Sequence, residues 1–230
     1  MAVTIPPPFT RGLKPQQISI GVIYEDEDVL IVDKPSGIPV HPGPGHPDGT
    51  LMNGVFARCP DVKDIDDTLR PGMVHRLDKD TSGLMVFAKS SFAQTNISRQ
   101  MSNRSVTKLY TVLVKGMLDK QEAFIDAPIG RDTFNRQKMA VVEHGKEARS
   151  KYKLLTRFLD FDLIQVKLLT GRTHQIRVHL SAIGHPVAGD QRYGGQVGGL
   201  SRQFLHASVL GFSHPSRLNY VEYSSPLPED

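Results

Sequence analysis

Short apolar runs of strand length alternate along this chain with loops rich in glycine, proline and charged residues, and this pattern limits the folds it can adopt. The run Leu84–Ala88 is continuous and apolar, which is typical of a strand buried on both faces. Helical patterns are few and fall irregularly between the strand patterns. The chain therefore predicts an α+β fold and not a repeating βαβ fold.

The expected elements follow from periodicity and from turn residues. A hairpin should occupy residues 20–32 around the acidic turn Glu25–Asp28. Helices are expected at 50–57, from Ser90 or Ser91 to Asn103, and at 174–183. Strands are expected at 84–88, 108–114, 148–155 and 161–169. The last helix should start at an N-cap, Thr173, and end at Gly184 and Pro186.

Length and composition suit one folded domain. The chain has 230 residues, of which 39% are hydrophobic and 23% charged, so it can bury a substantial core. Its single cysteine excludes an internal disulfide and favours a reducing, cytoplasmic location. No signal-peptide pattern or membrane-spanning apolar run occurs, so we expect no membrane partner. Residues 1–19 contain Pro6-Pro7-Pro8 and are expected to form a tail or linker before a domain at 20–230.

Charge is distributed unevenly along the chain. The net charge is +4, yet residues 131–180 carry 11 Lys and Arg against 5 Asp and Glu, and residues 21–80 carry 6 against 12. A basic middle, from about Arg99 to Arg177, suits a nucleic-acid partner. It is equally consistent with an ordinary solvated face.

The first cluster of polar residues, His75-Arg76-Leu77-Asp78, stands directly before the apolar run Leu84–Ala88. A sheet fixes such a loop while leaving it open to a ligand, so these residues are candidates for function. The alternative is that the aspartates and hydroxyl residues only close a turn. Asp78, with Arg76 before it and Lys79 beside it, is the residue that this alternative explains least well.

The second cluster is Gly171-Arg172-Thr173-His174-Gln175-Ile176-Arg177. Backbone N–H groups at a helix start, with arginines on either side, form a site suited to phosphate. Zinc bound by His174, His179 and His185 is a weaker alternative, because i, i+5 spacing does not bring two imidazoles to one helix face. His179 is better interpreted as an ordinary helix histidine.

The third cluster, Lys108-Leu109-Tyr110, opens a predicted strand. On pattern alone, Tyr110 shares a strand face with valines, which is typical of a core residue. The sequence contains no Walker or dinucleotide glycine motif and no Gly-x-Ser-x-Gly elbow, which removes most support for ATP, NAD and serine-hydrolase chemistry.

Taken in order, these clusters resemble the motifs of the RluA/RluD-type RNA pseudouridine synthases. The resemblance also includes Lys34-Pro-Ser-Gly-Ile-Pro-Val-His41, Gly184-His-Pro186 and Gly189-Asp190, and it spans about Ile20 to Tyr223. It implies a single catalytic domain with a mixed, largely antiparallel sheet flanked by helices, and with an RNA-binding cleft across it. It also implies RNA as the partner, with no metal and no cofactor.

The resemblance assigns roles to individual residues. Asp78 matches the family's catalytic aspartate, Arg172 resembles the arginine that pairs with it, and Tyr110 resembles the tyrosine that packs on the uracil. Arg76 resembles the arginine that enters the space left by a flipped base. The further residues expected to bind RNA or support the site are His75, Lys108, His174, Gln175 and Arg177.

Several alternatives stay open at this point. Many members of the family carry an N-terminal S4-type RNA-binding domain, and residues 1–19 are too short to form one, so we expect a catalytic domain without it, acting as a monomer. Asp78 can serve as a nucleophile or as the base of an elimination route. The substrate can be rRNA or tRNA. A non-catalytic RNA-binding factor and a metal-dependent hydrolase are the competing classes.

Overall fold

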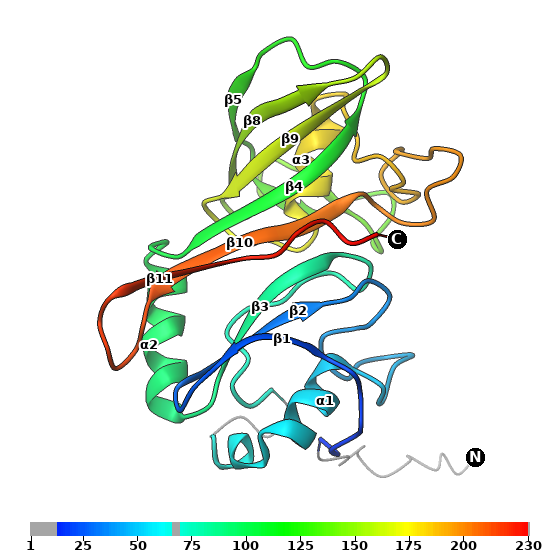
Figure 1. Ribbon diagram of the computed structural model, residues 1–230. Coiled ribbons are helices and arrows are strands. Elements are labelled where there is room, and N and C mark those ends of the chain that lie inside the picture. The colour runs from blue at the N-terminus through cyan, green and yellow to red at the C-terminus, as the bar shows by residue number, and fades with distance from the viewer. Residues whose placement is uncertain (1–12, 66–69, 230) are drawn as a thin grey trace, which may run out of the picture.

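The computed structural model describes residues 13–65 and 70–229, and it is built around one large twisted sheet (Figure 1). Its helices are α1 (Leu51–Arg58), α2 (Ser91–Ser102), α3 (Gln175–Ala182) and the 3-10 helix η1 (Pro60–Asp64). Its strands are β1 (Gly21–Glu25), β2 (Val29–Lys34), β3 (Ser82–Ala88), β4 (Thr107–Lys115), β5 (Glu122–Asp126), β6 (Ile129–Arg131), β7 (Met139–Val141), β8 (Arg149–Arg157), β9 (Phe161–Leu168), β10 (Leu205–Ser213) and β11 (Tyr220–Ser224).

The main sheet has nine strands in the order β1-β2-β3-β10-β4-β9-β8-β5, with β11 paired to β10. β3 and β10 run parallel, and every other strand pair in the described residues is antiparallel. Strands β6 and β7 form a separate two-stranded hairpin. The predicted α+β fold with a mixed, largely antiparallel sheet and flanking helices is therefore confirmed.

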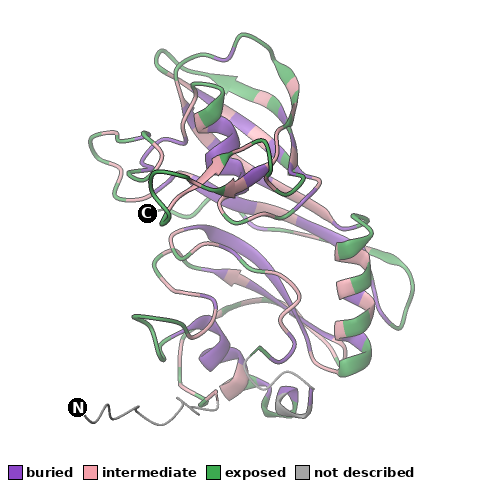
Figure 2. Ribbon diagram, turned by 180° about the vertical axis from the view of Figure 1, so that it is seen from behind, coloured by how far each residue is buried: buried purple, intermediate pink, exposed green. Residues whose placement is uncertain are grey.

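Two halves of the molecule meet along β10 (Figure 1). Strands β1 to β3 with α1 and α2 form one half, and strands β4, β9, β8 and β5 with α3 form the other. All seven residues of β3 are buried, as its continuous apolar run predicts. Figure 2 shows the buried residues concentrated on the central strands and on α3.

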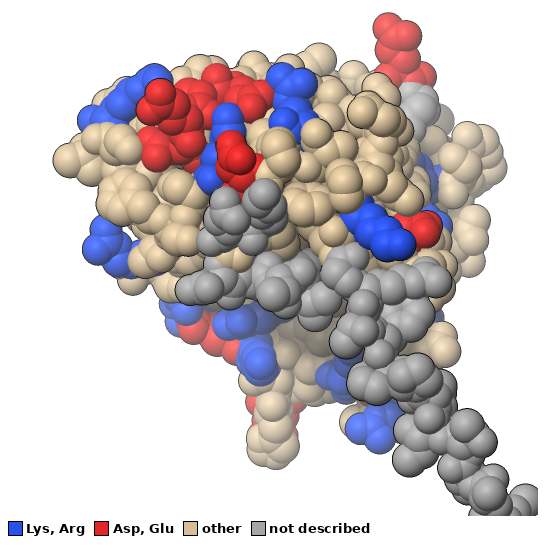
Figure 3. Space-filling view, turned by 90° about the horizontal axis from the view of Figure 1, so that it is seen from below, with Lys and Arg blue, Asp and Glu red and all other residues tan. Residues whose placement is uncertain are grey.

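The N-terminal half shows an uneven charge distribution on its surface. Figure 3 views the molecule from the end of this half, where acidic side chains gather in one area with basic side chains beside them. Ion pairs of Glu25 with Arg58 and Lys89 belong to this half. Because Lys89 lies outside residues 21–80, its ion pair offsets part of the acidic balance of that segment.

Most expected elements appear within a few residues of their expected ends. Ser90 caps α2, where its hydroxyl accepts a hydrogen bond from the Ala93 amide at 3.1 Å. The prediction that Thr173 caps α3 is wrong: the N-cap is His174, in a left-handed conformation with φ 56° and ψ 22°. The patterns described above do not single out β5, β6, β7, β10 or β11.

The predicted tail lies partly outside the described residues, which begin at residue 13. Its remaining part runs along α1, where the Gln16 amide donates to the Asn53 carbonyl at 3.0 Å and the Asn53 side chain donates to the Lys14 carbonyl at 2.8 Å. The described part of this segment therefore packs against the domain.

None of the helices in residues 13–65 and 70–229 combines the length and the apolar composition that crossing a membrane requires.

Candidate active site

The loop that precedes β3 forms the first wall of the candidate site. The Val86 amide donates to His75 Nε2 at 3.1 Å, so this ring nitrogen accepts and carries no proton. Burial lowers the pKa of His75 to about 3, and the charge of Lys108 adds to this effect. The Lys34 ammonium donates to the carbonyl of Lys79 at 2.8 Å and so holds the loop one residue beyond Asp78.

Asp78 is both a turn residue and a site residue. Its carbonyl accepts from the Thr81 amide at 3.2 Å and closes the loop, as the turn interpretation predicts. Its carboxylate leaves that turn and faces Arg177, whose Nη1 lies 2.9 Å from Oδ2. The side chain keeps 20% of its surface exposed, which leaves the carboxylate accessible from the pocket.

Strand β4 forms the second wall. Tyr110 is buried, and burial followed by the charge of Asp78 raises the pKa of its phenol well above the ordinary value. Burial also lowers the pKa of Lys108. Lys108 is half-buried, and in the described part of the chain its ammonium makes no ion pair with a carboxylate.

Residues 170–177 form the third wall, and Gln175 holds them in place. Its side-chain oxygen accepts from the Thr170 hydroxyl at 2.7 Å and from the Arg172 amide at 3.0 Å. Its nitrogen donates to the Arg149 carbonyl at 2.9 Å and to the Ser150 hydroxyl at 3.0 Å. Gln175 is buried with both ends bonded, so it supports the wall, which is one of the two roles expected of it.

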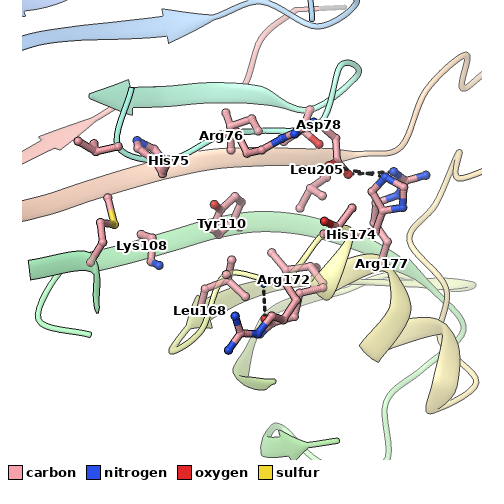
Figure 4. Close-up of a pocket in the computed structure, with 18 of the residues that line it drawn as sticks. His75, Arg76, Asp78, Lys108, Tyr110, Leu168, Arg172, His174, Arg177 and Leu205 are labelled. Carbon is pink, nitrogen blue, oxygen red and sulfur yellow. Dashed lines mark hydrogen bonds and ion pairs between the residues drawn. The ribbon is translucent and has the colours of Figure 1, made fainter. Parts of the chain in front are cut away.

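The expected pairing of Arg172 with Asp78 is wrong. Arg172 Nε donates to the Glu147 carbonyl at 2.8 Å. In Figure 4 the dashed line from Asp78 leads to Arg177, and the Arg172 side chain points away from both. The left-handed turn at His174 separates Arg172 from the helix, whereas Arg177 projects from the first helical turn toward Asp78.

Arg177 joins two carboxylates. Its Nε and Nη2 donate to the two oxygens of Asp190 at 2.7 and 3.0 Å, and its Nη1 donates to Asp78. Burial opposes the charge on Arg177, but the hydrogen bonds and charges of Asp190 and then Asp78 outweigh it and raise the pKa of the guanidinium. The charge of Asp78 is therefore compensated by a fixed, permanently charged partner.

His174 and Tyr193 extend this network. His174 Nε2 lies 3.8 Å from Asp78 Oδ1, and its Nδ1 lies 2.8 Å from the Tyr193 hydroxyl. The Arg177 guanidinium sits over the Tyr193 ring, 5.0 Å from the centroid. Burial lowers the pKa of His174, and the charge of Asp78 opposes this effect.

These walls enclose one pocket of about 360 Å³. All nine predicted site residues line it, although they come from three distant segments of the chain. They are His75, Arg76, Asp78, Lys108, Tyr110, Arg172, His174, Gln175 and Arg177. Sequence reasoning did not assign a role to Leu168 and Leu205, which add apolar surface, or to Asp190 and Tyr193 behind Arg177. Asp190 had a signal, because it stands in the Gly189-Asp190 motif.

The three histidines weighed as zinc ligands are engaged separately. His179 is buried, with its ring nitrogens 3.0 Å from the Ser150 hydroxyl and 2.9 Å from the Ala127 carbonyl, as expected for an ordinary helix histidine. His185 Nδ1 lies 3.0 Å from the Lys115 carbonyl. Within residues 13–65 and 70–229, no three His, Cys, Asp or Glu side chains are grouped closely enough to hold a metal ion.

Comparison with known proteins gives a consistent result. Residues 28–182 match the profile of the RNA pseudouridylate synthase family. An RNA pseudouridine synthase of Bacillus subtilis, YlyB, is 48% identical over 231 residues, covering 100% of this chain and 76% of the relative. The ribosomal large subunit pseudouridine synthase D of Pseudomonas aeruginosa is 46% identical and covers 94% of this chain and 70% of the relative.

A solved structure, the human RNA pseudouridylate synthase domain containing 1, superposes with a TM-score of 0.75 at 30% identity, covering 90% of this chain and 83% of the other. Fold, pocket and relatives together define the class as an RNA-modifying isomerase. The chain belongs to the RNA pseudouridylate synthase family.

Proposed function

We propose that Asp78 is the catalytic carboxylate of a uridine-to-pseudouridine isomerase. The reaction breaks the bond between C1′ and N1, turns the uracil and joins C5 to C1′, while one proton leaves C5 and one is taken up at N1. The product is an isomer of the substrate, so electrons and atoms balance. The step requires an ionised carboxylate beside the ribose, as a nucleophile toward C1′ or as the base of an elimination route.

The observation that carries this proposal is the pairing of Asp78 with Arg177 at the pocket. Arg177 binds Oδ2 of Asp78. The other oxygen, Oδ1, faces His174, whose Nε2 lies 3.8 Å away and is the nearest ion-pair partner of Oδ1 in the described residues. One oxygen is thus fixed and the other is free to act. Arg177 would therefore take the partner role that the resemblance implies for Arg172.

Tyr110 would pack against the uracil from β4. Because its phenol has a raised pKa, it is neutral at physiological pH and acts as a hydrogen-bonding surface and not as a phenolate. Its buried ring offers a flat apolar face next to Leu168 and Leu205. A flipped uracil needs such a face, since it loses its stacking in the RNA.

The target uridine would leave its stack to enter the pocket. Arg76 is exposed on the loop before β3, which suits a planar cation that occupies the vacated position in RNA. His75, Lys108 and His174 line the same opening. We infer that the substrate is ribosomal RNA, because the Pseudomonas aeruginosa relative is named as a synthase of the large ribosomal subunit. Transfer RNA is the alternative.

Asp78→Asn tests the catalytic assignment. This variant keeps the shape of the side chain and removes the charge, so it should abolish release of tritium from C5-labelled uridine in RNA while RNA binding persists. Asp80→Asn is the matched control, because Asp80 lies in the same loop and does not line the pocket. It should retain most of the turnover. Appreciable tritium release by Asp78→Asn would show that Asp78 is not the catalytic carboxylate.

A further inference from the structure

The oxygen of Asp78 that Arg177 does not bind faces a second polar group. Asp78 Oδ1 lies 3.8 Å from His174 Nε2, a distance too long for a direct hydrogen bond between the two atoms. Both side chains line the pocket and both are partly exposed. Figure 4 shows Asp78, His174 and Arg177 together at one end of the pocket. Oδ1 and Nε2 are therefore available to a polar group of the substrate.

Tyr193 determines which nitrogen of His174 carries the proton. The Tyr193 hydroxyl oxygen accepts from the Met139 amide at 3.1 Å and lies 2.8 Å from His174 Nδ1. Burial raises the pKa of Tyr193, so the phenol keeps its proton and remains a donor. Among the described residues, Nδ1 is the acceptor that this hydroxyl meets, so the hydroxyl donates to it. The ring proton of His174 is then on Nε2, which faces Asp78.

The backbones of His174 and Tyr193 hold the two rings in this arrangement. His174 has a left-handed conformation with φ 56°, which is uncommon for a residue other than glycine. The Tyr193 amide donates to Asp190 Oδ1 at 3.2 Å, and the Tyr193 carbonyl accepts from the Ser181 hydroxyl at 2.9 Å. The two rings meet edge to face, with their centroids 5.6 Å apart. The direction of His174 Nε2 is therefore fixed before a substrate binds.

An acceptor beside a donor is the complement of a hydroxyl group. An oxygen of an ionised carboxylate, such as Asp78 Oδ1, only accepts, and the protonated Nε2 of His174 only donates. A hydroxyl does both. One hydroxyl oxygen can lie about 2.8 Å from each of two atoms that are 3.8 Å apart, so it can bind both at once. An ether oxygen or a C–H group in the same place would leave at least one of the two atoms unpaired.

The ribose of the target uridine carries a hydroxyl at the corresponding position. Under the proposed function, on which this inference rests, Asp78 acts at C1′. The 2′-hydroxyl stands on the carbon next to C1′, whereas the 3′-oxygen is esterified in an RNA chain and cannot donate. A carboxylate oxygen has two lone pairs, so Asp78 Oδ1 can accept from the 2′-hydroxyl and still face C1′.

We propose that His174, oriented by Tyr193, recognises the 2′-hydroxyl of the target ribose together with Asp78. The hydroxyl donates to Asp78 Oδ1 and accepts from His174 Nε2. A deoxyribose would leave both atoms without a partner, which is unfavourable in a pocket that excludes water. His174 is thus a specificity-determining residue, which selects a ribonucleotide at the reacting position and does so independently of the base.

The test uses two substrates that differ in one atom. An RNA hairpin around a uridine that the native protein isomerises in ribosomal RNA is synthesised with either uridine or 2′-deoxyuridine at that position, labelled with tritium at C5. Single-turnover tritium release at saturating RNA gives the rate for each substrate. The native protein should prefer the ribose substrate about 100-fold, since each of the two hydrogen bonds contributes about tenfold.

His174→Ala removes the donor to the 2′-hydroxyl. It should lower the rate on the ribose substrate about tenfold and leave the rate on the deoxyribose substrate unchanged. His174→Gln, whose amide nitrogen can donate from a similar position, should recover part of the preference. Tyr193→Phe, which no longer donates to Nδ1, should lower the preference about threefold. His46→Ala is the matched control, because His46 is exposed and does not line the pocket, and it should change neither rate.

The comparison of the two substrates separates recognition from support of the pocket. Effects of the missing hydroxyl on the chemistry itself are the same in the native protein and in the variant, so they cancel in the ratio of preferences. An equal loss on both substrates in His174→Ala would mean that His174 only supports the pocket, and would overturn the proposal. An unchanged preference for ribose in that variant would overturn it as well.

The catalytic assignment fails by a different result. An Asp78→Asn variant that still releases tritium from the ribose substrate would reject Asp78 as the catalytic carboxylate. Full activity of the native protein, loss of activity in Asp78→Asn and equal losses on both substrates in His174→Ala would instead leave the catalytic assignment in place and reject the recognition of the 2′-hydroxyl by His174.

Discussion

Arg177 shows how one side chain can fix the position of a carboxylate in a pocket. Its guanidinium uses three N–H groups at once, two on Asp190 and one on Asp78. Asp190 is almost fully buried, so its two hydrogen bonds with Arg177 fix the orientation of the guanidinium without competition from solvent. The carboxylate of Asp78 is therefore held in one position before any RNA arrives, which is what catalysis by positioning requires.

Arg177→Lys should lower turnover about 100-fold, because a lysine ammonium cannot bind Asp190 bidentately and still reach Asp78. Arg172→Lys is the matched control: it keeps the charge at a position that contacts the Glu147 carbonyl and not Asp78. It should lose less than about fivefold. Single-turnover tritium release at saturating RNA measures both. Equal losses in the two variants would return the partner role to Arg172.

His75 predicts an acid-sensitive contribution to stability. Its folded pKa of about 3 lies below the ordinary value of 6.5, so the unfolded chain binds a proton that the folded chain does not between these values. The contribution of His75 is complete above pH 6.5 and is lost as the pH falls toward 3. The loss should reach on the order of 5 kcal/mol at the acid end of this window.

His75→Gln provides the measurement, since a glutamine oxygen can still accept from the Val86 amide but does not titrate. Urea unfolding followed by far-UV circular dichroism at pH 7 and at pH 4.5 should show a smaller acid-induced loss of stability in the variant. A parallel loss in the native protein and in His75→Gln would mean that another group causes the acid sensitivity.

The site residues could be found from the sequence, but their pairing could not. The polar clusters that interrupt apolar strands contain nine of the residues that line the pocket. The choice between Arg172 and Arg177 depends on the left-handed turn at His174 and on Asp190, which lies 13 residues beyond Arg177 and becomes its partner only in the folded chain. The Gly189-Asp190 motif marks Asp190 in the sequence but does not indicate that its partner is Arg177.

At the scale of elements, the parallel pairing of β3 with β10 joins the two halves of the sheet. It is short, with His206 opposite Ser82 and Ala207 opposite Gly83. Gly83 has φ +114°, and a Cβ there would lie 2.4 Å from the Ala207 carbonyl oxygen. The close approach of these two strands therefore requires glycine.

Gly83→Ala should lower the free energy of unfolding by about 3 kcal/mol, because it combines a strained backbone with a clash against a neighbouring strand. Gly198→Ala is the control, since nothing lies within 4 Å of a Cβ at that position. It should change the stability by less than about 0.5 kcal/mol. Urea unfolding measures both, and similar midpoints for the two variants would contradict the role given to this contact.

The strands that the sequence predicted are those with strong apolar patterns, and the strands it missed have physical reasons to be weak. β5 alternates between exposed and half-buried residues at the edge of the sheet, and so lacks a buried face. β10 is interrupted by a register shift between His206 and Val209, where it changes neighbours. Its strand character comes from pairing with β3, β4 and β11, which lie far away in the sequence.

At the scale of the whole molecule, one hydrophobic cluster extends through both halves. It includes Leu30 and Met85 from β2 and β3 together with Val112 and Ile164 from β4 and β9, and all four are fully buried. The pocket lies between segments from both halves, since Asp78 precedes β3 and Tyr110 belongs to β4. A common core thus fixes the distance between the Asp78 carboxylate and the Tyr110 ring.

A shared core predicts that the two halves unfold together. Leu30→Ala and Ile164→Ala each remove a fully buried side chain from opposite halves and should each lower the stability by about 3 kcal/mol. Both variants should show a single urea transition, with circular dichroism and tyrosine fluorescence coinciding. Hydrogen exchange should report faster opening of β9 amides in Leu30→Ala as well as in Ile164→Ala, because either change weakens the same cooperative unit. If Leu30→Ala instead accelerated exchange in β1 to β3 alone while β9 stayed protected, the halves would be separate units, and the geometry of the pocket would depend on how they dock.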